Sequence, residues 1–448
     1  MAGKIREIIN DIIKQRSKGN PAIIEMTKAK FILKGINPDK FHVDSEDNPV
    51  IMEKLFKIAE QLNVKKSTYD DVNIKSAFSK KCLENEVVDD IKNQLDLSGI
   101  KLIIYFASSN FDQQLLSSLM QETFKDCIVV GCSTSGEIVS GKLLKDSVVA
   151  MAFNSNIISD AKIQVIEKMK EGLNVERAFT SFERYFNESL YTMNSKKYVG
   201  IILIDGVSKK EERIMDLIGN RTNVFFIGGS AGDDCRFVKT HVCANGKAYN
   251  DSAVLVMLKI NDDAEFSIIK TQSFKCLDTK LVASKVNEEN REVIEFNDKP
   301  AILTYADALG VSSIEDAEKY FMTNPVGLLI GKNDMFVRSP QQVKGTSMLF
   351  YCSILKGMEV RLLQATNIIE DTKRAIEDRI QEFGKIDGII NFNCIERTLE
   401  LERKNLEEQY GELFRDIPTI GFSCYGEEFI GHINQTSTML AFRLKTNA

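Results

Sequence analysis

The 448-residue sequence has no tryptophan, only three histidines, and nine cysteines that form no CxxC pair. Because structural zinc sites need clustered cysteine and histidine ligands, we expect no such site. The odd number and wide separation of the cysteines predict free thiols in a reducing cytosol, where most would serve as small core residues.

Long apolar runs are also missing. No segment approaches about 18 uninterrupted apolar residues, so the sequence predicts no membrane-spanning helix. The N-terminal stretch MAGKIREIINDIIKQ is amphipathic, but it lacks the apolar core and the small-residue cleavage site of a secretory signal. We therefore expect a cytoplasmic protein.

Charge of neither sign dominates the chain. Lysine and arginine number 58, aspartate and glutamate number 64, and the formal net charge is -6. The basic residues are scattered, so there is no electrostatic basis for binding nucleic acid or an anionic membrane. The hydrophobic content of 43% over 448 residues predicts two or three globular domains.

Residues 1–64 predict a small helical domain. A first helix is indicated by isoleucines at helical spacing, namely Ile5, Ile8, Ile9, Ile12 and Ile13. A second helix begins at Pro21 and a third at Pro49, since proline suits the first turn of a helix. The polar segment NVKKSTYDD, residues 63–71, predicts a linker.

From residue 72 onward, strands alternate with helices, which predicts a mixed α/β (α+β) body. Three passages of this body resemble one another: strand, helix, strand, a glycine-serine turn with an acid, and another strand. The turns lie in VVGCSTSGEI, VFFIGGSAGDD and PTIGFSCYGEE. The first strand and the turn have similar spacing in each passage, from Ile104 to Gly131, from Ile202 to Gly228, and from Ile390 to Gly421. We therefore expect repeated strand-helix-strand units.

The glycine-serine turns are the candidate binding elements. Such a turn leaves backbone N–H groups free to face a ligand. Carboxylates beside these N–H groups could hold the ammonium group of an amino acid while the N–H groups hold its carboxylate. The candidate side chains are Ser133, Ser230, Ser423, Glu137, Asp233, Asp234 and Glu427. The alternative is that each one caps or pairs within its own turn.

The C-terminal segment contributes further candidates. His432 precedes Asn434 in GHINQT, a run of donors and acceptors that is unusual beside the apolar strand MLAF. His432 is either a ligand contact or a satisfied histidine at a strand edge. Tyr425 lies in the third turn. Arg397 in NCIERT could reach an anionic ligand with its rigid guanidinium group, or it could lie on a solvated helix face.

A nucleophilic enzyme is the alternative of a different class. GGSAG places Ser230 in the G-x-S-x-G pattern of hydrolases, but the following residues predict a turn into a strand instead of a helix. Cys132 and Cys424 lie at turns where exposed amides could lower a thiol pKa, or they point into the core. This alternative predicts acyl transfer by Cys424 or Ser230.

The turn motifs, together with FNCIERTLELE and IGFSCYGEEFIGHINQTSTMLAF, resemble the FIST family of sensory domains. The resemblance covers residues 72–446 and implies a FIST N-terminal domain at 72–262 and a FIST C-terminal domain at 290–446. It implies a cytoplasmic signal-input protein that is not an enzyme, binds small ligands such as amino acids, and passes the signal to a separate protein. Some relatives bind haem and respond to nitric oxide, which makes His432 a candidate axial ligand.

We hypothesise that the turns of the two FIST halves face a shared cleft. The ligand would contact residues from all three turns and from the C-terminal segment, namely Ser133, Glu137, Ser230, Asp233, Arg397, Tyr425, Glu427, His432 and Asn434. The composition, rich in lysine, isoleucine and asparagine, is typical of an AT-rich bacterial genome.

Overall fold

The structure is a computed structural model that describes residues 4–42, 45, 48–62, 64, 72–330 and 334–445. The chain forms two compact units, Met1–Val72 and Asn73–Ala448. The linker predicted at residues 63–71 lies outside the described residues, apart from Val64. Within the described ranges, no helix is long and apolar enough to cross a membrane.

The first unit consists of short helices around an isoleucine core. Its elements are α1 (Lys4–Ser17), α2 (Pro21–Leu33), η1 (Pro38–Lys40) and α3 (Pro49–Gln61). Asn20 and Asn48 accept hydrogen bonds from backbone N–H groups in the first turns of α2 and α3, and a proline follows each asparagine. The buried core includes Ile5, Ile8, Ile9, Ile12, Phe31 and Leu55.

Three structural repeats make up most of the second unit. The first contains β1 (Ile74–Ser79), α4 (Glu84–Gln94), β2 (Ile100–Ser108), α5 (Gln113–Thr123), β3 (Ile128–Thr134), β4 (Glu137–Val139), β5 (Lys142–Leu144) and β6 (Val148–Asn154). The second contains β7 (Ile158–Ile166), α6 (Val175–Phe186), β8 (Tyr198–Ile204), α7 (Glu211–Gly219), β9 (Phe226–Ser230), β10 (Val242–Ala244), β11 (Lys247–Tyr249) and β12 (Ala253–Ile260). The third contains β13 (Ala264–Gln272), α10 (Ile368–Phe383), β22 (Gly388–Cys394), α11 (Ile395–Lys404), α12 (Glu407–Glu412), β23 (Thr419–Cys424), β24 (Glu427–Phe429), β25 (Gly431–Ile433) and β26 (Thr436–Leu444).

Each repeat gives its short hairpin to the sheet of a neighbouring repeat. The β4–β5 hairpin of the first repeat pairs with β23 of the third, β10–β11 of the second pairs with β3 of the first, and β24–β25 of the third pairs with β9 of the second. The three sheets therefore share one strand order: β1-β6-β2-β3-β10-β11, β7-β12-β8-β9-β24-β25 and β13-β26-β22-β23-β4-β5. Because of this cyclic exchange, no repeat completes its sheet alone.

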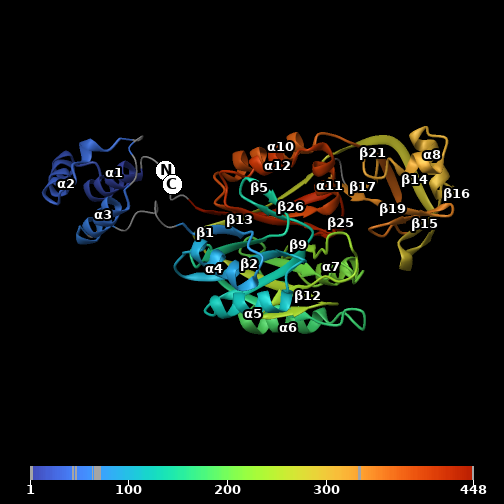
Figure 1. Cartoon of the computed structure of the whole chain (residues 1–448), viewed down its shortest axis with the longest axis horizontal. Coiled ribbons are helices and arrows are strands. Elements are labelled where there is room, and N and C mark those ends of the chain that lie inside the picture. The colour runs from blue at the N-terminus through green and yellow to red at the C-terminus, as the bar shows by residue number, and fades with distance from the viewer. Residues whose placement is uncertain are drawn as a thin grey trace. The chain divides into compact units, whose positions relative to one another are not determined.

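The three sheets turn one face toward a common core and the other toward helices. The common core contains apolar side chains from every sheet, and Phe106 of β2 contacts Phe422 of β23 with 4.5 Å between ring centroids. The outer faces are covered by α4 and α5, by α6 and α7, and by α10 to α12. Figure 1 shows α10 and α12 on one side of the strands and α5 and α6 on the opposite side. Burial on both faces explains why the central strands are almost continuously apolar.

An insertion in the third repeat, between β13 and α10, forms a lobe with its own core. Its elements are β14 (Phe274–Asn287), η2 (Glu288–Asn290), β15 (Glu292–Phe296), β16 (Lys299–Pro300), α8 (Ala301–Leu309), α9 (Ile314–Glu318), β17 (Val326–Ile330), β18 (Asp334–Arg338), β19 (Pro340–Lys344), β20 (Ser347–Phe350) and β21 (Glu359–Ala365). The lobe lies at one end of the repeats in Figure 1. Arg291 attaches it to α7 through ion pairs of 3.1 Å with both Glu211 and Glu212.

The predicted fold class, a mixed α+β fold with repeated strand-helix-strand units, is confirmed. The boundaries predicted for the two halves, 72–262 and 290–446, stay a prediction. The structure groups residues 73–448 in one compact unit because the exchanged hairpins connect the sheets of all three repeats.

Candidate functional site

The three glycine-serine turns, residues 133–137, 230–234 and 423–427, meet at what we call the turn junction. Each follows the second strand of a parallel pair, so all three lie at carboxyl ends of strands. Backbone hydrogen bonds join the turns: the Ser423 N–H donates to Gly136 (2.8 Å), the Gly232 N–H to Ser133 (3.0 Å) and the Tyr425 N–H to Ser230 (3.0 Å). The cyclic exchange of hairpins thus brings the three similar sequence motifs together in space.

Two turn glycines are required by close approach of neighbouring chain segments. A Cβ atom on Gly232 would lie 2.3 Å from the Ser135 Oγ atom, and a Cβ on Gly426 would lie 2.1 Å from the His432 Cε1 atom. Real side chains do not approach this closely, so these two positions accept no larger residue without rearrangement.

The two predicted glutamates occupy equivalent positions in the first and third repeats. Glu137 Oε2 accepts hydrogen bonds from the backbone N–H (3.1 Å) and the hydroxyl (2.5 Å) of Ser147, just before β6. Glu427 Oε2 accepts from the backbone N–H (3.1 Å) and the hydroxyl of Thr436, at the start of β26. Burial raises the pKa of Glu137 to about 7 and that of Glu427 to about 8. Both carboxyl groups therefore secure the start of a return strand.

The predicted serines are also bonded inside the junction. The Ser133 hydroxyl donates to the Gly232 carbonyl at 2.9 Å, and Ser230 donates to Glu428 Oε1 at 3.0 Å. Ser423 Oγ lies 2.7 Å from the Thr398 Oγ1 atom. All three serines are buried. Each hydroxyl therefore bonds outside its own turn and helps to hold the turns together.

Asp233 shapes the loop that follows the second turn. Its carboxylate accepts hydrogen bonds from the Tyr425 hydroxyl and from the backbone N–H groups of Phe237, Val238 and Lys239. Burial acts to raise its pKa, but these hydrogen bonds lower it below the usual value. Asp234, Cys235 and Phe237 have positive φ angles of 56°, 58° and 52°. Such backbone strain is concentrated at functional sites in many proteins.

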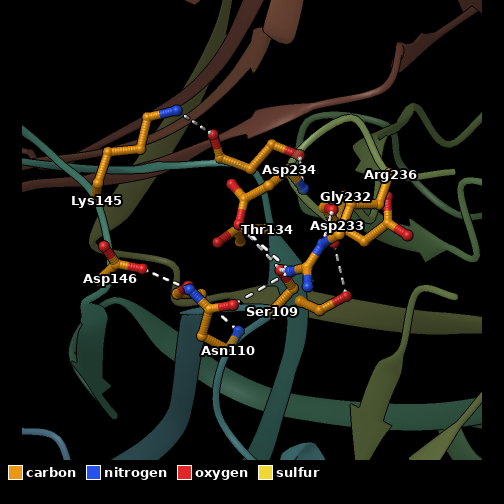
Figure 2. A network of polar contacts seen from close by, with 12 residues as sticks. Ser109, Asn110, Thr134, Lys145, Asp146, Gly232, Asp233, Asp234 and Arg236 are labelled. Carbon is orange, nitrogen blue, oxygen red and sulfur yellow. Dashed lines mark hydrogen bonds and ion pairs between the residues drawn. The ribbon is translucent and has the colours of Figure 1, made fainter. Parts of the chain in front are cut away.

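Above the junction lies a partly exposed network of charged and polar groups (Figure 2). Arg236 Nη2 donates to Ser109 Oγ (2.7 Å) and to Asn110 Oδ1 (3.2 Å), and it lies 3.5 Å from Asp234 Oδ2. Asn110 Nδ2 donates in turn to Asp146 Oδ1 at 2.5 Å. The side chains of Arg236 and Asp234 are 52% and 32% exposed, so solvent reaches both charges.

Lys145 completes this network on the side opposite Arg236 in Figure 2. Its Nζ atom lies 3.1 Å from Glu402 Oε1 and donates to the Ser135 carbonyl at 3.3 Å. The first repeat supplies Ser109, Asn110, Lys145 and Asp146, the second supplies the loop with Arg236, and the third supplies Glu402 through α11. All three repeats therefore contribute to one polar surface.

His432 and Asn434 lie in a different, buried cluster. His432 is 4% exposed, and its Nδ1 atom lies 3.0 Å from Glu428 Oε1. Burial alone would lower the pKa of His432, but the Glu428 carboxylate raises it well above the ordinary value, which favours an ion pair. Asn434 Oδ1 accepts a hydrogen bond from the Cys352 thiol at 2.6 Å. This cluster joins the β24–β25 hairpin to the inserted lobe.

A haem does not fit the surroundings of His432. The imidazole packs directly on the Gly426 backbone and also contacts Cys352 and Glu428. Haem ligation needs an apolar slot beside the ligating nitrogen, and polar and backbone groups fill this space.

Arg397 is buried and has no part in the exposed network above the turn junction. Its guanidinium group is buried and donates to Asn393 Oδ1 (3.0 Å), Ser273 Oγ (3.3 Å) and Thr372 Oγ1 (2.8 Å). These bonds connect α11 with α10 and with the residue that follows β13. The guanidinium group therefore serves as an internal brace in the third repeat.

The three candidate nucleophiles are in unfavourable settings for nucleophilic attack, and burial raises the pKa of the first, Cys132, well above the usual value. Cys424 is fully buried, its thiol donates to Glu427 Oε1 at 3.3 Å, and burial raises its pKa well above the usual value. A thiol in this setting stays protonated and weakly reactive. The Ser230 hydroxyl donates to the Glu428 carboxylate, which also contacts His432. Ser230 is nevertheless fully buried, so a substrate cannot reach its hydroxyl.

Sequence reasoning missed most of the exposed network. Asp234 was among the candidate acids, whereas Arg236, Ser109, Asn110 and Lys145 were not. The available signal was position, because Ser109 and Asn110 directly follow the strand that ends in YFAS, and Arg236 lies two residues beyond the second turn. Polar residues at the carboxyl ends of parallel strands are a common source of binding groups.

Comparison with known proteins gives two family matches and one relative. The FIST N domain matches residues 101–299, and the FIST C domain matches residues 301–429. An uncharacterized protein of Methanocaldococcus jannaschii is 22% identical over 315 residues, which make up 65% of this chain and 60% of that protein. The chain thus spans less than two thirds of the length of this relative.

Proposed function

The chain belongs to the FIST family, whose domains are small-ligand sensory domains in signal transduction, and from this premise we propose that it is a cytoplasmic sensor of an amino acid. The observation that carries the proposal is the partly exposed network above the turn junction, to which all three repeats contribute charged or polar side chains.

The network has the charges that an α-amino acid requires. The Arg236 guanidinium group presents a planar set of donors suited to the α-carboxylate. The Asp234 and Asp146 carboxylates lie within the same network and can accept hydrogen bonds from the ammonium group. The internal bonds of Arg236 to Ser109 and Asn110 would be replaced by bonds to the ligand. Asp233 and Tyr425 would act as positioning residues, because they fix the loop that carries Arg236.

Ligand binding would couple the three repeats. A ligand that contacts the loops of the first and second repeats would favour the arrangement in which these loops lie closest, and so shift the population of states. A separate signalling protein would read this shift. The helical first unit, residues 1–72, is the part of the chain outside the repeats that could carry the contact.

The direct test is isothermal titration calorimetry of the full chain with each of the twenty amino acids. We expect one class of amino acid to bind, and Arg236→Ala to weaken its affinity by about tenfold or more, since a charge-assisted hydrogen bond contributes roughly 1.5–3 kcal/mol. Arg221→Ala is the matched control, because the Arg221 side chain is 55% exposed, against 52% for Arg236, and it also forms an ion pair, with Glu176.

Two results would contradict the proposal. The first is that no amino acid binds to or thermally stabilises the folded protein. The second is an affinity that stays the same in Arg236→Ala and in Arg221→Ala. Native mass spectrometry of gently purified protein adds an independent readout, since a retained ligand of amino-acid mass would be lost on denaturation.

A further inference from the structure

The opposite ends of the three sheets, where the parallel strands begin, contain three equivalent seams between neighbouring repeats. The seam between the second and third repeats is a groove of about 570 Å³, bordered by the segments before β8 and β9 and by β13. The seam between the first and second repeats, at the starts of β2 and β3 and at β7, holds a hollow of about 320 Å³. At the third seam Ile74 of β1 packs against Gly388, where an added Cβ would lie 2.8 Å from the Ile74 side chain.

The backbone arrangement is the same at all three seams, but only one of them holds a groove. The side chains that line this seam therefore determine that it is open. In the small hollow, the ring of Tyr185 in α6 lines the space and its hydroxyl donates a hydrogen bond to Asp160 of β7 in the same repeat. The polar contacts of the groove lie at its rim, where Lys197 Nζ is 2.6 Å from Asp262 Oδ1 and Lys445 Nζ donates to the Asp262 carbonyl at 2.7 Å. Its volume lies within the range of roughly 300–1,000 Å³ that is usual for small-molecule sites.

The floor of the groove is aromatic and apolar. Phe225, which precedes β9, stacks on Phe429 of β24 with 6.2 Å between ring centroids and an interplanar angle of 25°. Phe225 is 43% exposed, although phenylalanine is one of the residues that proteins most often bury. Phe266 and Ile268 of β13 form the facing wall and are partly buried. This surface would gain from covering by an apolar or aromatic ligand.

The rim of the groove is positively charged. Its lining contains three lysines, Lys196, Lys197 and Lys445, and two acids, Asp262 and Glu265, which gives a net charge of 3 − 2 = +1. Both acids are already engaged: Asp262 lies 2.6 Å from Lys197, and Glu265 lies 2.7 Å from Arg443, which is outside the lining. The charge left for a ligand is therefore cationic.

We infer that this groove is a second ligand site, separate from the turn junction, and that it binds a small aromatic molecule with an anionic group. The aromatic body lies on Phe225 and Phe429, and the anionic group lies near Lys196. Because β24 belongs to the third repeat and pairs with β9 of the second, the ligand contacts both partners of an exchanged hairpin. The site does not depend on amino-acid binding at the junction.

The test uses two fluorescent probes of similar shape with the full chain: 8-anilinonaphthalene-1-sulfonate, which is anionic, and N-phenyl-1-naphthylamine, which is neutral. We expect saturable binding of the anionic probe at one site. The double variant Phe225→Ala/Phe429→Ala should weaken its affinity by about tenfold or more, as for aromatic residues at the centre of an interface. Tyr191→Ala, which removes an aromatic side chain that is 65% exposed elsewhere, should leave the affinity unchanged.

A charge reversal tests the anionic part of the inference. Lys196→Glu should weaken binding of the anionic probe by about fivefold to tenfold and leave the neutral probe unaffected. Lys80→Glu is the control, because Lys80 is exposed and lies outside the groove lining. Equal effects of the two reversals, or equal effects of Lys196→Glu on both probes, would overturn the assignment of an anionic ligand.

The site itself is overturned if the anionic probe binds without saturation, or with the same affinity to the folded double variant. If the double variant does not fold, Ile268→Trp provides a second test, since it enlarges a side chain on the face of β13 that forms the groove wall. This variant should block the probe, and unchanged binding to it would contradict the inference. Arg236→Ala should leave probe binding intact, so failure of the proposed amino-acid site and failure of the groove give different results.

Discussion

The two ends of the same three sheets are organised in opposite ways. At the carboxyl ends of the parallel strands, all three repeats meet in the turn junction through hydrogen bonds between buried groups. At the amino ends, the three equivalent seams differ: one is a groove of about 570 Å³, one is a hollow of about 320 Å³, and one is closed by Ile74.

The two ends differ because buried backbone N–H groups need hydrogen-bond acceptors at one end and not at the other. Return strands begin at the junction, so buried backbone N–H groups need acceptors in every repeat. Glu137 and Glu427 supply them in the first and third repeats, and in the second Asp205 accepts from the backbone N–H of Asp251 and from the Thr240 hydroxyl. At the other end, neighbouring repeats meet only through side chains. The side chains at each seam can therefore differ without leaving backbone groups unpaired.

The largest effect should come from removing a junction carboxylate. Glu427→Ala leaves the buried N–H and hydroxyl groups of Thr436 and the Cys424 thiol without their acceptor. We expect the free energy of unfolding in urea to fall by about 3 kcal/mol, since each buried unsatisfied polar group costs roughly 1–3 kcal/mol. Glu171→Ala removes a glutamate whose side chain is 73% exposed and should have little effect. A loss for Glu427→Ala no greater than that of the control would show that the junction carboxylates do not hold the return strands.

The pH dependence of stability tests the same end of the sheets. The pKa of Glu137 is raised to about 7 in the folded protein, above its ordinary value of 4.5, so the folded state binds this proton more tightly than the unfolded chain. The stability that the protonated group contributes is full below pH 4.5 and is lost as the pH rises through about 7. Glu137→Gln cannot titrate, so its unfolding free energy should decline less between pH 5 and pH 8, by about 2 kcal/mol. Parallel pH profiles of the variant and the wild-type protein would contradict this expectation.

A smaller effect is expected at the closed seam. Ile74→Val removes one methylene group from a buried side chain in close contact with Gly388. The free energy of unfolding should fall by about 1 kcal/mol, which is typical of such a deletion in a packed core. Ile32→Val in α2, where the side chain is exposed, should change it far less. Equal effects at both positions would mean that the third seam is not closed by packing.

The sequence predicted the repeat order, the turns and the fold class because these depend on local patterns. The alternation of strands and helices and the spacing from Ile104 to Gly131 are visible along the chain. The exchange of hairpins was not predictable, because the pairing of Glu427 with Gly229 joins residues about 200 positions apart and leaves no local signal. The same reason hid the groove, since Phe225 and Phe429 meet only through that pairing.

The smallest effect on the free energy of unfolding should come from a substitution at the open seam. Its size shows whether the groove is a binding surface or part of the packing between repeats. Phe225→Ala removes a ring that is 43% exposed and whose contact with Phe429 lies where β9 begins and β24 ends. If the groove exists to receive a ligand, the unfolding free energy without ligand should change by less than about 1 kcal/mol, well below the roughly 3–5 kcal/mol of a buried phenylalanine. Urea denaturation with and without the anionic probe measures both quantities, and the stabilisation by the probe should be reduced in the variant. A large loss of stability without the probe would instead show that Phe225 is part of the packing that joins the second and third repeats. The open seam would then be a packed contact between repeats, as the seam at Ile74 is, and not a ligand site.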